Sequence, residues 1–595
     1  MRLTSLLSKL LTAIAASVAA AILVVACGDA GTPPEAAPVT TADGKVVASL
    51  QAHSAEFEPR VVKVTDGVYV AVGYALANSI MLEGDDGVVI VDVTESVEAA
   101  RNIMTEFRKI TDKPVAALIY THNHADHVFG GRGFVPEGEV RVYAHDTTNY
   151  YINRFANIIR PAIYTRSTRM FGTLLPPGPE GVVNAGIGPF LDQGGHASGS
   201  IGLIRPNHTF ADELELEIAG IRLQLVHAPG ETNDQVFVWL PDRRVLLPGD
   251  NVYKAFPNLY TIRGTLYRDV LQWSRSIDLM RALEPEHLVP SHTGPLSGRD
   301  EVMAVLTAYR DAIQFVHDQS IRGINQGHTP DELVQVVRLP PQLREHPWLA
   351  EHYGTVEWSV RSIFNGYLGW FGGDAAFLSP VSPGERGSRI DALAGGEDQA
   401  LGAVEHAVAA GEYRWAAELA SYLISSGEGG KRAATLKGEA LRQLGYASIS
   451  PNGRNYYLTQ AGELEGSLAV EPVAIEGDQL AFAKSLPVGE LLSSLPVNLD
   501  PEKAAGVNSA MSLRFTDTDE AFTLQIRNSI AQLMPGADSG ADLQVETDSD
   551  TWVEIMLGQR GVPGALAAGD IRLGNGVRDV PELVSFLLMF RSQSP

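Results

Sequence analysis

Thr121-His122-Asn123-His124-Ala125-Asp126-His127 directly follows Pro114–Tyr120, an apolar run typical of a buried strand. Three imidazoles and a carboxylate within six residues suit a protein core poorly, but they suit divalent metal ions well. If the backbone runs extended from His122, His122 and His124 project to the same side. A turn would then bring Asp126 and His127 to a neighbouring ion. The alternative is a solvated polar turn after a strand.

Three more metal-competent side chains lie downstream, each on a loop just past an apolar run: Glu231, Asp250 and His292. Such loops carry the binding residues in layered α/β folds. Glu231 and Asp250 would lie at the same edge of a sheet if residues 233–240 and 244–247 form a hairpin. Asn233 and Asp234 are further candidates to orient ligands, and Asp234 is the reserve ligand for Glu231.

The order HxHxDH, Pro-Gly-ligand, Gly-Asp and Ser-His resembles the metallo-β-lactamase superfamily. Most of that superfamily has His after Pro-Gly, whereas Glu231 at this place resembles the alkyl sulfatases. The strings Asn258–Gly264 and Glu351–Phe371 are also similar to that family, and the resemblance runs from about Val61 to the C-terminus. One departure is Gly249-Asp250-Asn251, where the family often has Ala-Glu-Asn.

The resemblance implies two Zn²⁺ ions, other divalent metals being possible. It implies one ion held by His122, His124 and Glu231, a second held by Asp126, His127 and His292, and Asp250 as the bridge. Two metals about 3.5–4 Å apart can share a water and lower its pKa, which supplies a hydroxide nucleophile without a side-chain base.

The implied reaction is hydrolysis of alkyl sulfate esters to an alcohol and inorganic sulfate. Asp126 and Asp250 would act through the metals, while Arg263 and Arg268 are candidates to stabilise the sulfate oxygens. For Arg268 an exposed surface charge is the alternative. The aromatic residues Phe171, Tyr260 and Trp273 could line an alkyl channel or only fill the core.

The length of the chain indicates how many domains it has, and its net charge restricts the classes of molecule that it can bind. The chain has 595 residues, enough for three or four domains. Its formal net charge of −25 argues against nucleic-acid binding, because phosphates would be repelled. An anionic substrate therefore needs local positive charge from metals and arginines.

The N-terminus has the pattern of an export signal. A basic start is followed by the apolar run Leu10–Ala26 and then by Cys27, the only cysteine. This resembles a bacterial lipoprotein signal, so we expect an exported lipoprotein, periplasmic or tethered to the outer face of a membrane through lipidated Cys27. The alternative is an uncleaved membrane anchor, for which the run is slightly short.

The predicted fold class is α/β. The predicted parts are a signal peptide (1–27), a flexible tether (28–55), an αββα metallo-β-lactamase sandwich (56–300), an all-α dimerisation domain (301–470) and an α+β sterol-carrier-like domain (471–595). The dimerisation domain and the sterol-carrier-like domain are assigned from the resemblance to the alkyl sulfatases, which also implies a homodimer. Leu583–Phe590 could bury the substrate's alkyl chain or pack its own domain's core.

Two rival functions stay open. One is a metal hydrolase of the same fold that acts on another ester, a lactam or a phosphodiester. The other is a carrier of apolar ligands with a vestigial metal domain, although the complete set of metal ligands argues against it.

Overall fold

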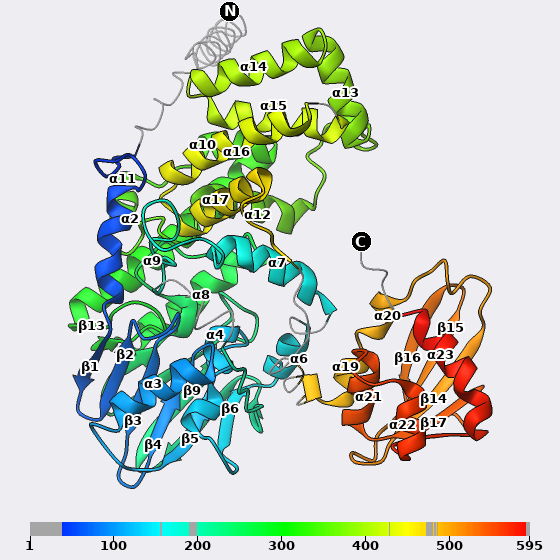
Figure 1. The fold of residues 1–595 in the computed structure, drawn as a ribbon. Coiled ribbons are helices and arrows are strands. Elements are labelled where there is room, and N and C mark those ends of the chain that lie inside the picture. Colours follow the sequence, from blue (N-terminus) through cyan, green and yellow to red (C-terminus); the bar gives the residue numbers. More distant parts are fainter. Residues whose placement is uncertain are drawn as a thin grey trace, which may run out of the picture. The chain divides into compact units, whose positions relative to one another are not determined.

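The computed structural model describes residues 38–154, 158–189, 199–427, 429–471, 480, 483–484 and 486–590 (Figure 1). The predicted signal peptide and Cys27 lie outside these residues. Within the described residues, no helix has both the length and the apolar character needed to span a membrane.

Two sheets form the first part of the described chain. The first has seven strands in the order β1 (Arg60–Thr65), β2 (Val68–Val72), β3 (Ser79–Glu83), β4 (Val88–Val91), β5 (Val115–Ile119), β6 (Arg141–His145) and β7 (His208–Phe210). The second has six strands in the order β13 (Leu296–Ser297), β12 (His287–Leu288), β11 (Val245–Leu247), β10 (Val236–Leu240), β9 (Ile221–His227) and β8 (Glu213–Ile218). The antiparallel pairing of β10 with β11 confirms the predicted hairpin.

The two sheets pack face to face, with helices on their outer faces. Their inner faces share one core, in which Val70 and Ile119 of the first sheet meet Leu225 and Val238 of the second. Helix α3 (Val97–Phe107) packs on the outer face of the first sheet. The predicted αββα sandwich is thus confirmed.

The helices α8 (Val270–Ala282) and α9 (Arg299–Asn325) cover the second sheet. Buried residues of α9, such as Leu306 and Ile313, belong to the same core as Phe237 of β10. The sandwich therefore extends beyond residue 300, where the sequence placed its end, because the apolar face of α9 is buried against it.

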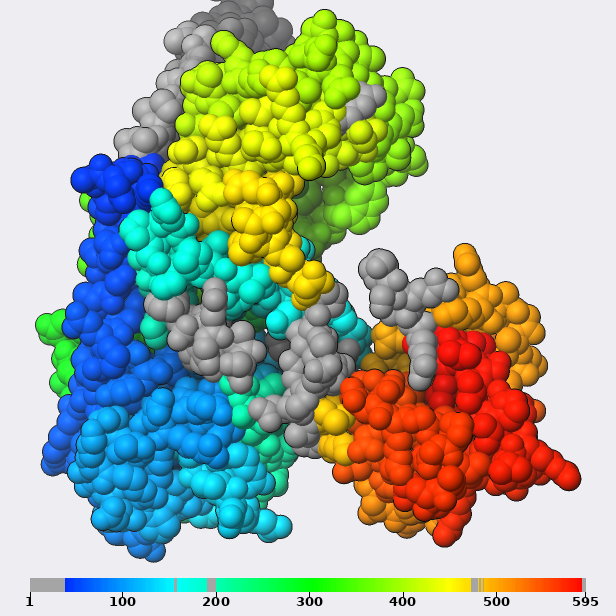
Figure 2. All heavy atoms as spheres, viewed as in Figure 1, coloured from blue at the N-terminus to red at the C-terminus, as the bar shows by residue number. Residues whose placement is uncertain are grey.

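Helices follow from residue 330 to residue 465: α10 (Pro330–Val336), α11 (Pro341–Arg344), α12 (Val356–Leu368), α13 (Pro383–Ala394), α14 (Glu397–Ala409), α15 (Tyr413–Ser426), α16 (Gly430–Ala447) and α17 (Pro451–Glu465). Helices α14 to α17 share a core that includes Val404, Leu423 and Leu441. The space-filling view shows this yellow-green segment as a closely packed mass of atoms (Figure 2). The predicted all-α segment is confirmed.

The C-terminal part is α+β, as predicted. Its five-stranded sheet has the order β16 (Ile530–Pro535), β15 (Ala521–Arg527), β14 (Ser509–Phe515), β17 (Leu543–Thr547) and β18 (Ile571–Leu573). Its last three helices are α21 (Ser549–Met556), α22 (Val562–Ala568) and α23 (Val580–Leu588).

The predicted tether is wrong at its C-terminal end. Residues of the expected tether form helix α2 (Ala48–His53) and lead into the 3-10 turn η1 (Ser54–Phe57). Val46, Val47 and Leu50 are buried in a small apolar cluster. These closely spaced apolar side chains anchor the segment, so a flexible linker cannot extend to residue 55.

Candidate metal centre

The seven predicted metal ligands lie on loops that follow four strands. The HxHxDH stretch leaves β5 and enters the short helix α4 (Ala125–Val128). Glu231 follows β9, Asp250 lies in the 3-10 turn η3 (Gly249–Asn251) after β11, and His292 follows β12. These strands belong to both sheets, and the loops that carry the ligands meet at one edge of the sandwich.

The structure brings all seven side chains together in three overlapping groups, in each of which the ligand atoms lie within 4.8 Å of one another. The groups are His122 with His127 and Asp250, Asp126 with His127 and His292, and His124 with Glu231 and Asp250. Asp250 and His127 each belong to two groups, and of these two only Asp250 has a carboxylate, whose two oxygens suit a bridge between two ions. The predicted second set, Asp126, His127 and His292, is one of the three groups.

The donor atoms point at one another as metal ligands do. Oδ2 of Asp250 lies 3.4 Å from Nε2 of His127 and 3.1 Å from Nε2 of His292. Nε2 of His122 lies 2.9 Å from Nδ1 of His124. Nε2 of His127 and Oδ1 of Asp250 are buried without a hydrogen-bond partner among the described residues. Buried polar atoms of this kind normally have partners, so a bound cation fits the site.

In His127 and His292, the ring nitrogen that points away from the ligand cluster contacts an oxygen atom of the surrounding protein. Nδ1 of His127 lies 2.8 Å from Oδ2 of Asp92, and Nδ1 of His292 lies 2.9 Å from the carbonyl oxygen of Leu76. Such contacts fix the orientation of each ring and leave its other nitrogen for a metal.

Burial, aided by neighbouring positive charges, lowers the pKa of His122 and His124 well below the ordinary value. Both imidazoles are therefore neutral, which is the form that binds metal. Burial also opposes protonation of His127 and His292, but the carboxylate of Asp250 outweighs it and raises the pKa of both. An ion bound at these two residues must therefore compete with protons.

Glu231 is buried beside a buried cation. Nη1 of Arg268 lies 3.0 Å from Oε1 of Glu231, and the Tyr253 hydroxyl lies 3.3 Å from Oε2. Burial raises the pKa of Glu231 to about 7, although Arg268 acts in the opposite direction. Arg268 is thus a buried partner of a predicted ligand rather than an exposed surface charge.

Arg268 also lines the cavity at the site. Its Nε and Nη2 are buried and have no hydrogen-bond partner in the described part of the chain. Together they form the edge of the guanidinium group that matches two oxygens of an anion. Nη2 of Arg263 lies 3.1 Å from Nε2 of His124, so the second predicted arginine is also at the site.

The cavity has a volume of about 90 Å³. Its lining includes His124, Glu231, Arg263 and Arg268, with Tyr151, Tyr267, Ile159, Ile163 and Leu266 among the less polar residues. Among the described residues, Phe171, Tyr260 and Trp273 are not part of this lining. Trp273 is fully buried in the sandwich core, so for this residue the alternative of a core role is confirmed.

Asp234 does not reach the ligand cluster. It accepts hydrogen bonds from Nδ2 of Asn123 at 2.5 Å and from the Thr148 hydroxyl at 2.8 Å. Because Asn123 lies between two predicted ligands, Asp234 orients the HxHxDH loop. The reserve ligand therefore has the orienting role, and Glu231 faces the site.

Asp92 is the main residue that sequence reasoning missed. It is fully buried after β4 and accepts hydrogen bonds from the Thr121 backbone and hydroxyl and from the Ser291 hydroxyl. It thus joins the HxHxDH loop to the loop of His292. Its position directly after the apolar run 88–91 was the available signal, the same one that identified the later ligands.

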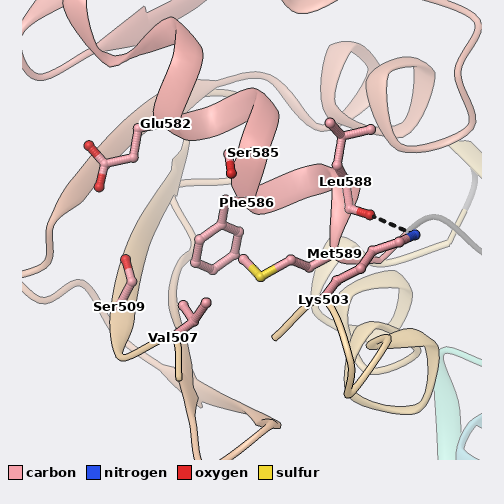
Figure 3. Close-up of a pocket in the computed structure, with 8 residues that line it drawn as sticks. All are labelled: Lys503, Val507, Ser509, Glu582, Ser585, Phe586, Leu588 and Met589. Atoms are coloured by element: carbon pink, nitrogen blue, oxygen red, sulfur yellow. Dashed lines mark hydrogen bonds between the residues drawn. The ribbon is translucent and has the colours of Figure 1, made fainter. Parts of the chain in front are cut away.

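The apolar helix α23 mainly packs its own domain. Leu583, Phe586 and Leu587 are buried in the core of the C-terminal part. A hollow of about 460 Å³ opens beside this helix. In Figure 3, Phe586 and Met589 face it near Lys503, whose Nζ donates a hydrogen bond to the carbonyl oxygen of Leu588.

Comparisons with known proteins agree with this architecture. The metallo-beta-lactamase superfamily matches residues 72–292, the alkyl sulfatase dimerisation family matches residues 329–467, and the alkyl sulfatase C-terminal family matches residues 459–593.

Several curated and solved proteins are similar along most of the chain. A linear primary-alkylsulfatase of Pseudomonas sp. is 40% identical over 515 residues, which cover 84% of this chain and 96% of that protein. An alkyl/aryl-sulfatase of Saccharomyces cerevisiae is 28% identical and covers 90% of this chain and 83% of its own. The solved structure of a stereoselective inverting sec-alkylsulfatase from Pseudomonas sp. has a TM-score of 0.87 at 27% identity, covering 94% of this chain and 88% of that one. This chain therefore belongs to the alkyl sulfatase family within the metallo-β-lactamase superfamily.

Proposed function

We propose that this protein hydrolyses alkyl sulfate esters to an alcohol and inorganic sulfate, using two divalent metal ions. The observation that carries the proposal is Arg268, a lining residue of the cavity whose buried guanidinium edge, Nε and Nη2, has no hydrogen-bond partner among the described residues. A sulfate group has the oxygen spacing that such an edge binds with two hydrogen bonds.

The donor set supports metal binding and favours zinc. Four imidazoles and three carboxylates are typical ligands of zinc, and no thiolate is needed. His122, His124 and Glu231 would hold one ion, and Asp126, His127 and His292 the other, with Asp250 shared. When bound, such ions acidify a water molecule and stabilise negative charge on the ester.

The chain's own residues bind and orient the ester. Arg268 would bind two sulfate oxygens through its unpartnered edge, and Arg263 would add a second positive charge. Ion pairing with Glu231 fixes the Arg268 guanidinium, so little reorganisation is needed when the substrate binds. Ile159, Ile163 and Leu266 offer the alkyl group an apolar wall.

The relatives favour a sulfate ester over the rival substrates. Their names describe linear primary, secondary and mixed alkyl or aryl sulfatases. The carrier alternative gains no support, because all seven predicted ligands lie together.

An activity panel tests the proposal. Purified protein is assayed for sulfate release from dodecyl sulfate and for turnover of a lactone and a bis-aryl phosphate, with metal analysis of the same sample. We expect sulfate release and about two ions per chain. The variant His124→Ala should have a deficient metal content and no turnover, whereas exposed His208→Ala should match the wild type. Preferred turnover of the lactone or phosphate, or full activity of His124→Ala, would refute the proposal.

A further inference from the structure

Two segments that are distant in the sequence line the cavity of the metal site. Helix α7 (Arg160–Phe171) contributes Ile163, which is part of the apolar wall proposed for the alkyl group. Residues 261–264, which we call the arginine turn, contribute Arg263, which is proposed to bind the sulfate group. A sulfate ester in this cavity contacts both segments at once, so the spacing between α7 and the arginine turn affects how well the ester fits.

Arg166 of α7 joins these two segments. Its Nε donates a hydrogen bond to the carbonyl oxygen of Arg263 at 2.8 Å, and its Nη2 donates one to the carbonyl oxygen of Ile262 at 2.5 Å. The planar guanidinium group presents its donors with a fixed spacing. Here two of these donors bind two consecutive carbonyl oxygens of one turn, so Arg166 holds the backbone of the arginine turn at two points.

Other contacts hold the same two segments together. Thr261 is buried, and its hydroxyl donates a hydrogen bond to the sulfur of Met170 on α7 at 3.2 Å. A Cβ atom added to Gly264 would lie 3.5 Å from Cδ1 of Ile163 and 3.8 Å from Nε of Arg166, so the backbone of the turn packs directly against α7. The N–H of Gly264 donates a hydrogen bond to the carbonyl oxygen of Thr261 at 2.9 Å, which closes the turn.

The side chain of Arg263 extends from the backbone that Arg166 holds. Its Nη2 lies 3.1 Å from Nε2 of His124, so the guanidinium group reaches the predicted metal ligands. A displacement of the backbone at residue 263 would therefore move a charged group inside the cavity. Such displacements matter, because a misplacement of about 1 Å can lower a reaction rate by about 100-fold.

We propose that Arg166 is a positioning residue for the sulfate ester: it holds the arginine turn against α7 and so sets the distance between the Arg263 guanidinium group and the apolar wall. Arg166 itself is not among the described residues that line the cavity, and it contacts Arg263 through the backbone. It therefore acts through Arg263 rather than on the substrate. The effect on substrate binding rests on the proposed function, whereas the attachment of the turn to α7 does not.

Helix α7 supplies a matched control three residues further along. Arg169 is half-buried like Arg166, and its guanidinium group binds both carboxylate oxygens of Glu463 on α17, each at 2.8 Å. Arg166→Lys and Arg169→Lys each replace a two-donor contact of α7 and keep the positive charge, but only the first changes a contact with the arginine turn. The test is made on the full, metal-loaded chain, with octyl sulfate as the substrate and 1-octanesulfonate as a probe that has no ester bond.

We expect Arg166→Lys to raise the KM for octyl sulfate and the Kd for 1-octanesulfonate by about tenfold, the usual effect of losing one hydrogen bond to a charged group. Metal content and melting temperature should match those of Arg169→Lys, whose KM and Kd should equal those of the wild type. A KM and Kd that are unaltered in Arg166→Lys, or raised equally in both variants, would overturn the proposal.

A double-mutant cycle tests whether Arg166 acts through Arg263. In the background of Arg263→Gln, the change Arg166→Lys should alter the Kd for 1-octanesulfonate by less than about twofold, because the group that Arg166 positions is already lost. A general loss of stability would instead add its full effect to that of Arg263→Gln. Additive effects of the two changes would therefore refute the positioning role.

Hydrogen exchange tests the attachment of the turn without any substrate. The amide of Gly264, which closes the turn, should exchange faster in Arg166→Lys than in the wild type and at the wild-type rate in Arg169→Lys. Equal exchange in the two variants would overturn the attachment. If the wild type hydrolyses no sulfate ester, the proposed function fails, but the exchange rates still decide whether Arg166 holds the turn. Should Arg166→Lys not fold, Arg166→Gln replaces it in each measurement.

Discussion

The carboxylate of Asp92 lies 2.8 Å from Nδ1 of His127, on the side of the ring away from the predicted metal position. The same carboxylate accepts hydrogen bonds from Thr121 and Ser291. One buried acid thus holds two of the loops that carry predicted ligands.

Asp92→Asn should weaken metal binding by about 10- to 100-fold, the usual effect of losing a group behind a metal ligand. The amide nitrogen of Asn cannot accept the hydrogen bonds that the carboxylate oxygen receives. Isothermal titration of the metal-free protein measures the effect. Asp242→Asn, which changes an exposed carboxylate, is the matched control. Equal affinity in the two variants would show that Asp92 does not position the ligands.

Metal affinity should fall as the pH falls. The pKa of His127 and His292 is raised in the metal-free protein, so each of these residues holds its proton to a higher pH than a free imidazole and an ion must compete with that proton. Each proton displaced changes affinity about tenfold per pH unit. Chelator competition between about pH 6 and pH 8 measures the slope. An affinity that does not change over this range would contradict the assigned ligands.

Arg268→Lys should weaken the binding of the sulfate group while it preserves the positive charge that pairs with Glu231. The lysine keeps a positive charge beside the buried carboxylate but lacks the two-donor edge. We expect a KM for dodecyl sulfate raised by about tenfold or more, the equivalent of one charge-assisted hydrogen bond. Metal content should be unchanged.

Arg268→Gln should additionally lose metal or stability, because it leaves the buried Glu231 carboxylate unpaired. The control is Arg222→Lys, which alters an exposed arginine paired with Asp242. An unaltered KM in Arg268→Lys would remove Arg268 from the sulfate site.

Acid should destabilise the fold through His352. Its ring stacks on His53 with 4.3 Å between centroids, and burial beside His53 lowers the pKa of His352 to about 3. In the unfolded chain this pKa is about 6.5. Between about pH 6.5 and pH 3 the unfolded state therefore binds a proton that the folded state does not bind. Because of this difference, the free energy of unfolding falls by up to about 1.4 kcal/mol for each unit by which the pH falls.

Urea unfolding at several pH values tests this effect. His352→Gln should flatten the pH dependence, while exposed His208→Gln should leave it unchanged. A slope that is the same in both variants would assign the acid sensitivity to other groups.

The sequence was sufficient to predict the ligand loops because each ligand follows an apolar run. His122, Glu231, Asp250 and His292 all have this local signature, and a family resemblance added their order. Asp92 has the signature too, but a lone carboxylate after a strand is common and its partners are distant in the sequence. The hydrogen bond from Ser291, for example, joins residues 199 positions apart.

Contacts between distant segments explain what sequence reasoning did not anticipate. The burial of Arg268 depends on Glu231, 37 positions earlier. The ordered segment around Leu50 depends on packing near Val183 and Ile449, and its own composition resembles a linker. Local patterns predict where a strand or helix forms, but they do not identify which distant surface will cover it.

The predicted ligands come from both sheets, since His122 follows β5 of the first sheet and the other loops follow β9, β11 and β12 of the second. A complete binding site therefore exists only after the two sheets have docked. Metal uptake by a refolding chain should lag behind secondary-structure formation and coincide with closure of the sandwich. The bound ions would then cross-link loops of the two sheets, and metal binding would be the last step in the folding of a newly made chain.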